Sequence, residues 1–202
     1  MSLVPWPGLF VATPAPTVHT DRGCYLIGQQ VKVSGSGFAP DRSFTVTIDG
    51  VDFGESTTDS GGGFSSSLVP GGLGAGIAQH VDHLVASDGS HTAGTTFTLT
   101  RPPGARFLAT SGNPNTLRAP FELWDFGAGN TIYLHYVAPS GHLRKTVRLG
   151  AGGGQCGYLK THRRKVFPFS PSKGRWTLQV DTQNHYAAHP SGSVARIRVK
   201  IS

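Results

Sequence analysis

The residues best suited to chemistry in this sequence are cations gathered in two short runs of its second half. The runs are His142-Leu143-Arg144-Lys145-Thr146-Val147-Arg148 and Lys160-Thr161-His162-Arg163-Arg164-Lys165. Guanidinium groups on a sheet face pair with phosphate or carboxylate through two parallel hydrogen bonds, and lysines add point charges. We therefore predict a binding site for a polyanion or an acidic partner, formed by Arg144, Arg148, Lys160, Arg163, Arg164 and Lys165.

If the first run is a strand, its side chains alternate between the two faces of the sheet. Arg144, Thr146 and Arg148 then share one face, and Lys145 and Val147 share the other. A polysaccharide or a nucleic acid would meet the arginines as a polyanion. The alternative is a solvated surface, or one that complements an acidic neighbouring protein, and the sequence favours that alternative.

The charge of the chain is strongly divided between its halves. The formal net charge is +7, from 18 Lys and Arg against 11 Asp and Glu. Residues 1–103 have a net charge of −4 and residues 104–202 a net charge of +11. This polarity favours a polyanion or an acidic surface as the partner of the second half, or head-to-tail contacts between copies of the chain.

Groups suited to catalysis or metal binding are present but poorly spaced. His80 and His83 flank Asp82, and their separation places the two imidazoles on opposite faces of a strand instead of around one ion. Gly35-Ser36-Gly37 is shorter than the nucleophile elbow of hydrolases. Gly152-Gly153-Gly154 lacks the Lys-Ser/Thr that follows a phosphate-binding loop. We predict a non-enzymatic protein with no catalytic residue, no metal and no cofactor.

The chain has two cysteines, Cys24 and Cys156. They are compatible with one long-range disulfide, and equally with two unrelated buried thiols. A bond between them would close a loop of more than 100 residues and contribute about 4–5 kcal/mol through loop-closure entropy. The sequence leaves both states open.

Short apolar stretches punctuated by glycine and proline predict an all-β fold. The chain of 202 residues contains 28 Gly and 14 Pro, the two residues least suited to helices. Alternation is clearest at Phe44, Val46 and Ile48, which fall on one face of an expected strand that ends at the turn Asp49-Gly50. No apolar stripe of helical period persists along the chain, so helical bundles and coiled coils are excluded.

The same order of strands and turns occurs twice, about 90 residues apart. Residues 132–137, for example, correspond to residues 44–48. Between the repeats, Arg101-Pro102-Pro103-Gly104 is typical of a linker, because proline cannot pair inside a central strand. The sequence therefore predicts two antiparallel β-sandwiches in tandem, at residues 21–103 and 104–202.

Residues 1–20 are predicted to be an extended, proline-rich arm. The segment lacks the basic start of a signal peptide, and its prolines interrupt the apolar region that such a peptide needs. Trp6, Leu9 and Phe10 are too apolar for a free tail, so we expect them to dock on a neighbour; the alternative is the remnant of a leader. No run of about 18 apolar residues exists, so no membrane-spanning segment is predicted.

The first repeat resembles the immunoglobulin-like modules of bacterial surface proteins. The likeness lies in Val31-Lys32-Val33-Ser34-Gly35-Ser36-Gly37-Phe38-Ala39-Pro40, in Thr58-Asp59-Ser60-Gly61-Gly62-Gly63-Phe64 and in Thr96-Phe97-Thr98-Leu99-Thr100. Asp21-Arg22-Gly23-Cys24-Tyr25 and Gln155-Cys156-Gly157 look like segments of secreted two-module proteins of actinobacteria. The resemblance implies two immunoglobulin-like sandwiches at the cell surface or outside the cell, with a structural or interaction role through a protein partner or self-assembly. Such modules also decorate phage capsids and tails, so a virion decoration or tail accessory protein is the alternative.

Overall fold

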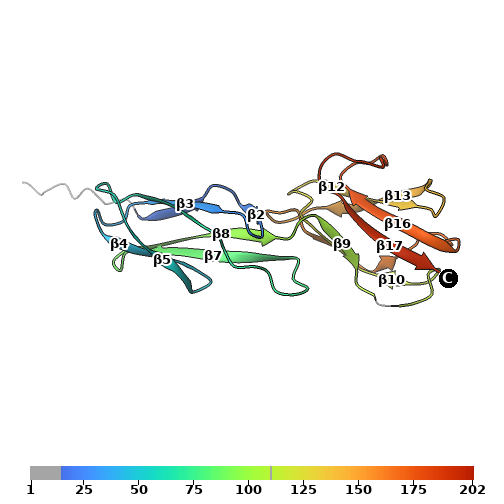
Figure 1. The fold of residues 1–202 in the computed structure, drawn as a ribbon, viewed down its shortest axis with the longest axis horizontal. Coiled ribbons are helices and arrows are strands. Elements are labelled where there is room, and N and C mark those ends of the chain that lie inside the picture. Colours follow the sequence, from blue (N-terminus) through green and yellow to red (C-terminus); the bar gives the residue numbers. More distant parts are fainter. Residues whose placement is uncertain (1–14, 110) are drawn as a thin grey trace, which may run out of the picture. The chain divides into compact units, whose positions relative to one another are not determined.

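The computed structural model describes residues 15–109 and 111–202 (Figure 1). These residues form strands joined by turns and loops, and none of them is helical. The prediction of an all-β fold is therefore confirmed. Accordingly, this part of the chain contains no helix long and apolar enough to cross a membrane. Trp6, Leu9 and Phe10 lie outside the described residues, so their docking role stays a prediction.

The chain forms two compact units. Unit 1 combines the described residues up to Asp21 with Lys32–Leu68 and His83–Thr95. Unit 2 combines Arg22–Val31, Val69–Asp82 and Thr96–Ser202. A division into two sandwiches near residue 103 stays a prediction.

The first half of the chain forms a three-stranded and a five-stranded sheet. The smaller sheet has the order β1-β3-β6, with β1 (Thr17–Thr20), β3 (Val31–Ser36) and β6 (Phe64–Leu68). The larger sheet has the order β2-β8-β7-β4-β5, with β2 (Cys24–Leu26), β8 (Thr92–Thr100), β7 (Gln79–Ser87), β4 (Ser43–Ile48) and β5 (Val51–Thr57). Strand β1 is made of the last four residues of the segment expected to be an arm, and Val18 within it is buried.

Within unit 1, aromatic packing joins β4 of the larger sheet to β6 of the smaller sheet. Phe44 of β4 stacks on Phe64 of β6, with ring centroids 4.2 Å apart. Phe44, Val46 and Ile48 are all buried, as their alternation predicts. Gly35 lies inside β3, where a Cβ atom would come within 2.3 Å of the Phe64 ring. The glycine at this position therefore makes room for an aromatic core residue.

Strand β2 departs from the antiparallel pattern that the sequence predicts. It pairs with β8 in parallel, with Cys24 opposite Thr98. The preceding strand, β1, pairs antiparallel with β3 in the other sheet. The chain changes sheets between Thr20 and Cys24 without reversing, so β2 meets the closing strand β8 in the same direction.

The second half of the chain forms three further sheets. The largest has the order β13-β12-β16-β17, with β13 (Leu143–Ala151), β12 (Thr131–Val137), β16 (Gly174–Asp181) and β17 (Ala195–Ile201). A three-stranded sheet has the order β14-β11-β9, with β14 (Leu159–Lys160), β11 (Phe121–Trp124) and β9 (Gly104–Phe107). A short ribbon pairs β10 (Arg118–Ala119) with β15 (Arg164–Lys165).

One core lies between these sheets. Phe121 of β11, Leu134 of β12 and Leu178 of β16 are completely buried in it. Trp176 is buried there too and packs edge-on against Phe167, with ring centroids 5.5 Å apart. Because core residues alternate along β12 and β16, every second side chain of these strands points to the opposite face of the sheet.

A disulfide joins Cys24 on β2 to Cys156 in the turn before β14, 132 positions later in the sequence. The two Cα atoms lie 5.3 Å apart, within the usual range for disulfides. Both cysteines belong to unit 2, so the bond ties an N-terminal strand to the C-terminal part of the same unit. The sequence left free thiols and a disulfide equally open, and the structure has the disulfide.

Candidate functional site

Three of the predicted cationic residues line one pocket of about 400 Å³, which we call the basic groove. They are Lys160, Arg163 and Arg164. The remaining lining residues are Leu149, Leu159, Thr161 and His162. Leu149 belongs to β13, the edge of the four-stranded sheet, and Leu159 to β14, the edge of the three-stranded sheet. The basic groove therefore lies between two sheet edges.

Backbone hydrogen bonds hold the cationic wall of the groove in place. Strand β14 pairs with β11, and β15 pairs with β10, so the short turn between them is fixed at both ends. Within the turn, the Thr161 amide donates to the Phe121 carbonyl, and the Phe121 amide donates to Thr161 Oγ1, each over 2.9 Å. Arg163 donates from Nη2 to the Arg118 carbonyl over 3.1 Å. The cations are thus displayed on a rigid support.

Cations outnumber acidic groups around the groove in the described part of the chain. Between Asp125 and Asp181 the sequence has nine Lys and Arg and neither Asp nor Glu. The ion pair that the described residues form with a Lys or Arg of the second half is Arg106 with Glu122, and none of the nine takes part in one. An unbalanced set of cations on rigid strands attracts an anionic partner.

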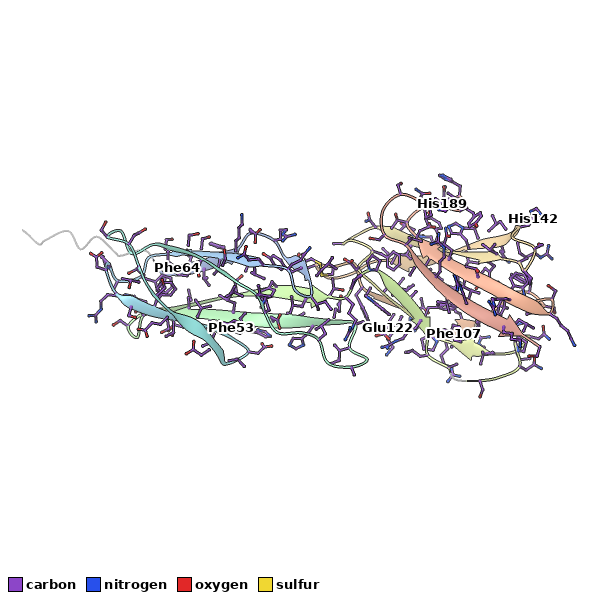
Figure 2. The ribbon with its side chains drawn as sticks, viewed as in Figure 1. Phe53, Phe64, Phe107, Glu122, His142 and His189 are labelled. Carbon is purple, nitrogen blue, oxygen red and sulfur yellow. A yellow bond between two sulfur atoms is a disulfide. The ribbon has the colours of Figure 1, made fainter. Side chains whose placement is uncertain are left out.

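Glu122, which Figure 2 labels, is an acidic group beside the cationic wall, and its carboxylate already accepts hydrogen bonds from other residues. It lies opposite Lys160, but its Oε2 accepts from Arg106 Nε over 2.6 Å and its Oε1 accepts from the Tyr158 hydroxyl over 2.8 Å. Burial acts to raise the pKa of Glu122, yet these hydrogen bonds and the charges of Arg106 and Lys160 outweigh it and hold the pKa below its usual value. Burial and the bond to Glu122 raise the pKa of Tyr158 to about 12.

Two cations lie directly opposite each other beside the groove. Arg118 of β10 is the register partner of Lys165 of β15, and both are exposed. Like charges in directly opposite positions destabilise a strand pair by a few tenths of a kcal/mol, up to about 1 kcal/mol. An anion bound between the two side chains would remove that cost.

The remaining predicted residues, Arg144 and Arg148, do not line the groove. A register irregularity lies next to Arg144 in β13, and the Arg144 guanidinium carbon is 5.8 Å from the centre of the Phe169 ring. Thr146 instead bonds to His135, and Arg148 lies opposite Tyr133. The register from Lys145 to Arg148 is regular, so Thr146 and Arg148 share a face as predicted, whereas the irregularity at Arg144 interrupts the alternation that was to place Arg144 with them.

A buried polar network on the outer face of the four-stranded sheet was missed by the sequence analysis. His135 and Asp181 are both 0% exposed, and His135 Nε2 lies 3.1 Å from Asp181 Oδ1. Thr146 Oγ1 lies 2.8 Å from His135 Nδ1. Hydroxyl, imidazole and carboxylate in this order are the groups of a hydrolase triad. His135 and Asp181 are completely buried, whereas Thr146 is partly exposed, and both buried groups also bond to the backbone of Gln183.

This network holds down the loop of residues 182–194, which carries His189 (Figure 2). His135 Nε2 also lies 3.1 Å from the Gln183 carbonyl; because both of its neighbours accept, this nitrogen carries a proton. Gln179 Nε2 donates to the Ala187 carbonyl, and Arg196 Nη2 donates to the Ala188 carbonyl. Alternation with core residues is the signal that marks His135 as outward-facing, but nothing local in the sequence shows that a loop covers it.

Arginine side chains clamp another loop within unit 2. Arg101 donates from Nε to the Ile77 carbonyl over 2.9 Å and from Nη2 to the Leu73 carbonyl over 3.1 Å. Arg106 donates from Nη2 to the Gly76 carbonyl over 2.9 Å. The segment that the sequence predicts to be a linker therefore supplies a hydrogen-bonded anchor for residues 73–77.

Two further groups have special environments. Asp125 has a φ of 63°, in the left-handed region that Asp and Asn tolerate better than most residues. Burial raises its pKa to about 6. On β7, His80 Nε2 lies 3.6 Å from Asp82 Oδ1, while His83 occupies the alternate face.

No protein-family model and no curated protein matches this chain. Among solved structures, it is similar to a tetra-tandem repeat from the extending region of a large adhesion protein, at 11% identity and a TM-score of 0.34, over 93% of this chain and 49% of that one. It is also similar to fibronectin(III)-like modules of Clostridium thermocellum CbhA, at 13% identity and a TM-score of 0.31, over 91% and 94%. A Parabacteroides merdae β-glucuronidase is similar at 11% identity and a TM-score of 0.32, over 94% and 24%. The chain spans about half of the adhesion-protein repeat and about a quarter of the glucuronidase.

At these values the likenesses carry no argument about what this chain does. They give no support to an actinobacterial origin or to a virion protein.

Proposed function

We propose that this chain is a non-enzymatic interaction protein, built of two immunoglobulin-like β-sandwiches, that acts at the cell surface or outside the cell. The observation that carries the proposal is the set of nine cations on hydrogen-bonded strands and turns, none of which forms an ion pair within residues 15–109 and 111–202. Such an array is suited to binding an anion rather than to forming or breaking covalent bonds. The disulfide supports the location, because such bonds persist in oxidising compartments.

The test compares two charge variants of the full chain. Arg163→Ala/Arg164→Ala removes two cations of the basic groove. Lys173→Ala/Arg175→Ala is the matched control, because it removes two exposed cations of the same acid-free segment that do not line the groove. We expect retention on immobilised anionic ligands to fall for the groove variant and to change little for the control. If the two variants are retained equally on the anionic ligands, the groove is not a binding site.

A second candidate function is the binding of a polyanion such as a polysaccharide or a nucleic acid. It is favoured by the like-charge pair Arg118 and Lys165, which extends the cationic surface beyond the groove. Heparin and single-stranded DNA columns at increasing salt test it, since polyanion binding weakens steeply with salt.

A further inference from the structure

The basic groove runs beside a free strand edge. Strand β13 has nine residues, Leu143–Ala151, and pairs with β12 on one side, in regular register from Lys145 to Arg148 and with irregularities at Arg144 and Leu149. On its other side, the described part of the chain provides no strand and no backbone hydrogen bond. An unpaired edge presents alternating N–H and C=O groups that another extended chain can bind by adding as a strand.

The floor and the wall of the groove differ in character. Leu149 and Leu159 supply the apolar part. Lys160, Arg163 and Arg164 supply the cations. Side chains of an added strand alternate between two directions, so one set can contact leucine while the other meets the cations.

The chemistry of the lining distinguishes among anionic partners. Sugars and unpaired bases are usually held by stacking on aromatic rings. None of the residues that line the basic groove is Phe, Tyr or Trp. Tyr158, next to Leu159 in sequence, has its hydroxyl committed to Glu122. A groove with cations, leucines and a free edge is better matched to a polypeptide with carboxylate side chains.

The cations also limit which extended chains can pair with the free edge of β13. An exposed edge invites pairing with any extended chain unless charged side chains oppose it. Lys145 and Arg148 are exposed on β13 itself and repel a basic strand or another copy of the same edge. An acidic strand meets attraction instead of repulsion at the same place.

From these observations we propose that the basic groove binds an acidic, extended segment of a partner polypeptide, which adds along β13 with its carboxylates toward Lys160, Arg163 and Arg164. This inference rests on the proposed interaction function and names its partner class. Recognition then has two separable parts: backbone pairing with the edge, and carboxylate pairing with the wall.

The experiment measures fluorescence anisotropy of labelled ten-residue peptides titrated with the full chain. The test peptide alternates Glu and Thr. A second peptide has the same sequence with alternate backbone amides N-methylated, which removes strand pairing and keeps every charge. A third peptide alternates Lys and Thr. Heparin and a single-stranded oligothymidylate serve as competitors.

We expect the Glu-Thr peptide to bind and the Lys-Thr peptide to fail. N-methylation of the peptide and the Arg163→Ala/Arg164→Ala variant are each expected to weaken binding by about tenfold or more, because each change removes a few hydrogen bonds. Lys173→Ala/Arg175→Ala is expected to leave it within about twofold.

Other results overturn the inference in distinguishable ways. Equal binding of the methylated peptide refutes strand addition. Binding of heparin or oligothymidylate through Arg163 and Arg164, without peptide binding, refutes the polypeptide partner and leaves the proposed interaction function standing. Absence of groove-dependent binding to every anionic probe refutes both.

Discussion

Removing the disulfide should cost this chain about 5 kcal/mol of unfolding free energy. Cys24 and Cys156 are 132 positions apart, and a cross-link of that span removes about 17 cal/mol/K of entropy from the unfolded chain. At 25 °C this corresponds to about 5 kcal/mol, comparable with the whole stability of many domains. We therefore expect Cys24→Ser/Cys156→Ala to be marginally stable or unfolded at 37 °C.

The substitutions are chosen so that the folded state changes little. Cys156 is buried, so alanine avoids an unsatisfied hydroxyl there, while Cys24 is partly exposed and tolerates serine. The loss should then come from the unfolded chain. Urea titrations followed by the fluorescence of Trp124 and Trp176 give the free energy, with mass spectrometry confirming the bond in the unmodified protein.

The control is the unmodified chain in reductant, which should lose the same free energy because it loses the same cross-link. A difference below about 1 kcal/mol between oxidised chain and double variant would refute the loop-entropy reasoning. Equal stability of oxidised and reduced chain would have the same meaning.

Three further outcomes follow from other features. Asp181→Ala should destabilise by about 1–3 kcal/mol, because it removes the carboxylate that His135, Gln179 and the Gln183 amide bond to in a buried site, and limited proteolysis should then cut residues 182–194 faster. Asp125→Asn should change the pH profile: the folded pKa of about 6 exceeds the unfolded value near 4, so the unmodified chain loses stability as pH rises from 4 to 6, whereas the variant does not. At pH 7 urea titration should find the variant more stable by about 1 kcal/mol, after discounting for solvent screening. Deleting residues 1–14, which leaves β1 intact, should abolish any self-assembly seen by light scattering if the arm docks on a neighbouring copy; unchanged assembly would refute that role.

Local pattern was enough to predict part of this fold. Alternation at Phe44, Val46 and Ile48 identified a strand face that is indeed buried, and glycine and proline content excluded helices. Both inferences depend on residues close in sequence, where periodicity determines which way a side chain points.

Long-range pairing set the limits of prediction. Whether Cys24 meets Cys156 depends on a sheet change at β2, which short-range periodicity does not encode. Regular alternation predicted that Arg144 and Arg148 share a face of one strand. A register irregularity at Arg144 in β13 interrupts that alternation. Lys160 and Arg164 were identified as cations from the sequence, but the groove between them and Leu149 exists only once two sheet edges face each other.

The disulfide also determines how this chain responds to tension. A pull applied to segments on either side of Cys24 and Cys156 passes through the sulfur atoms and does not stretch the residues between them. Those residues would add about 450 Å of length if drawn out, at about 3.4 Å per residue. Strands β3 to β13, including the free edge beside the basic groove, thus lie outside the load path. The cationic wall of the groove, Lys160, Arg163 and Arg164, follows Cys156 and therefore lies in the load path. Stretching the C-terminal segment would draw this wall away from the free edge and release a bound partner.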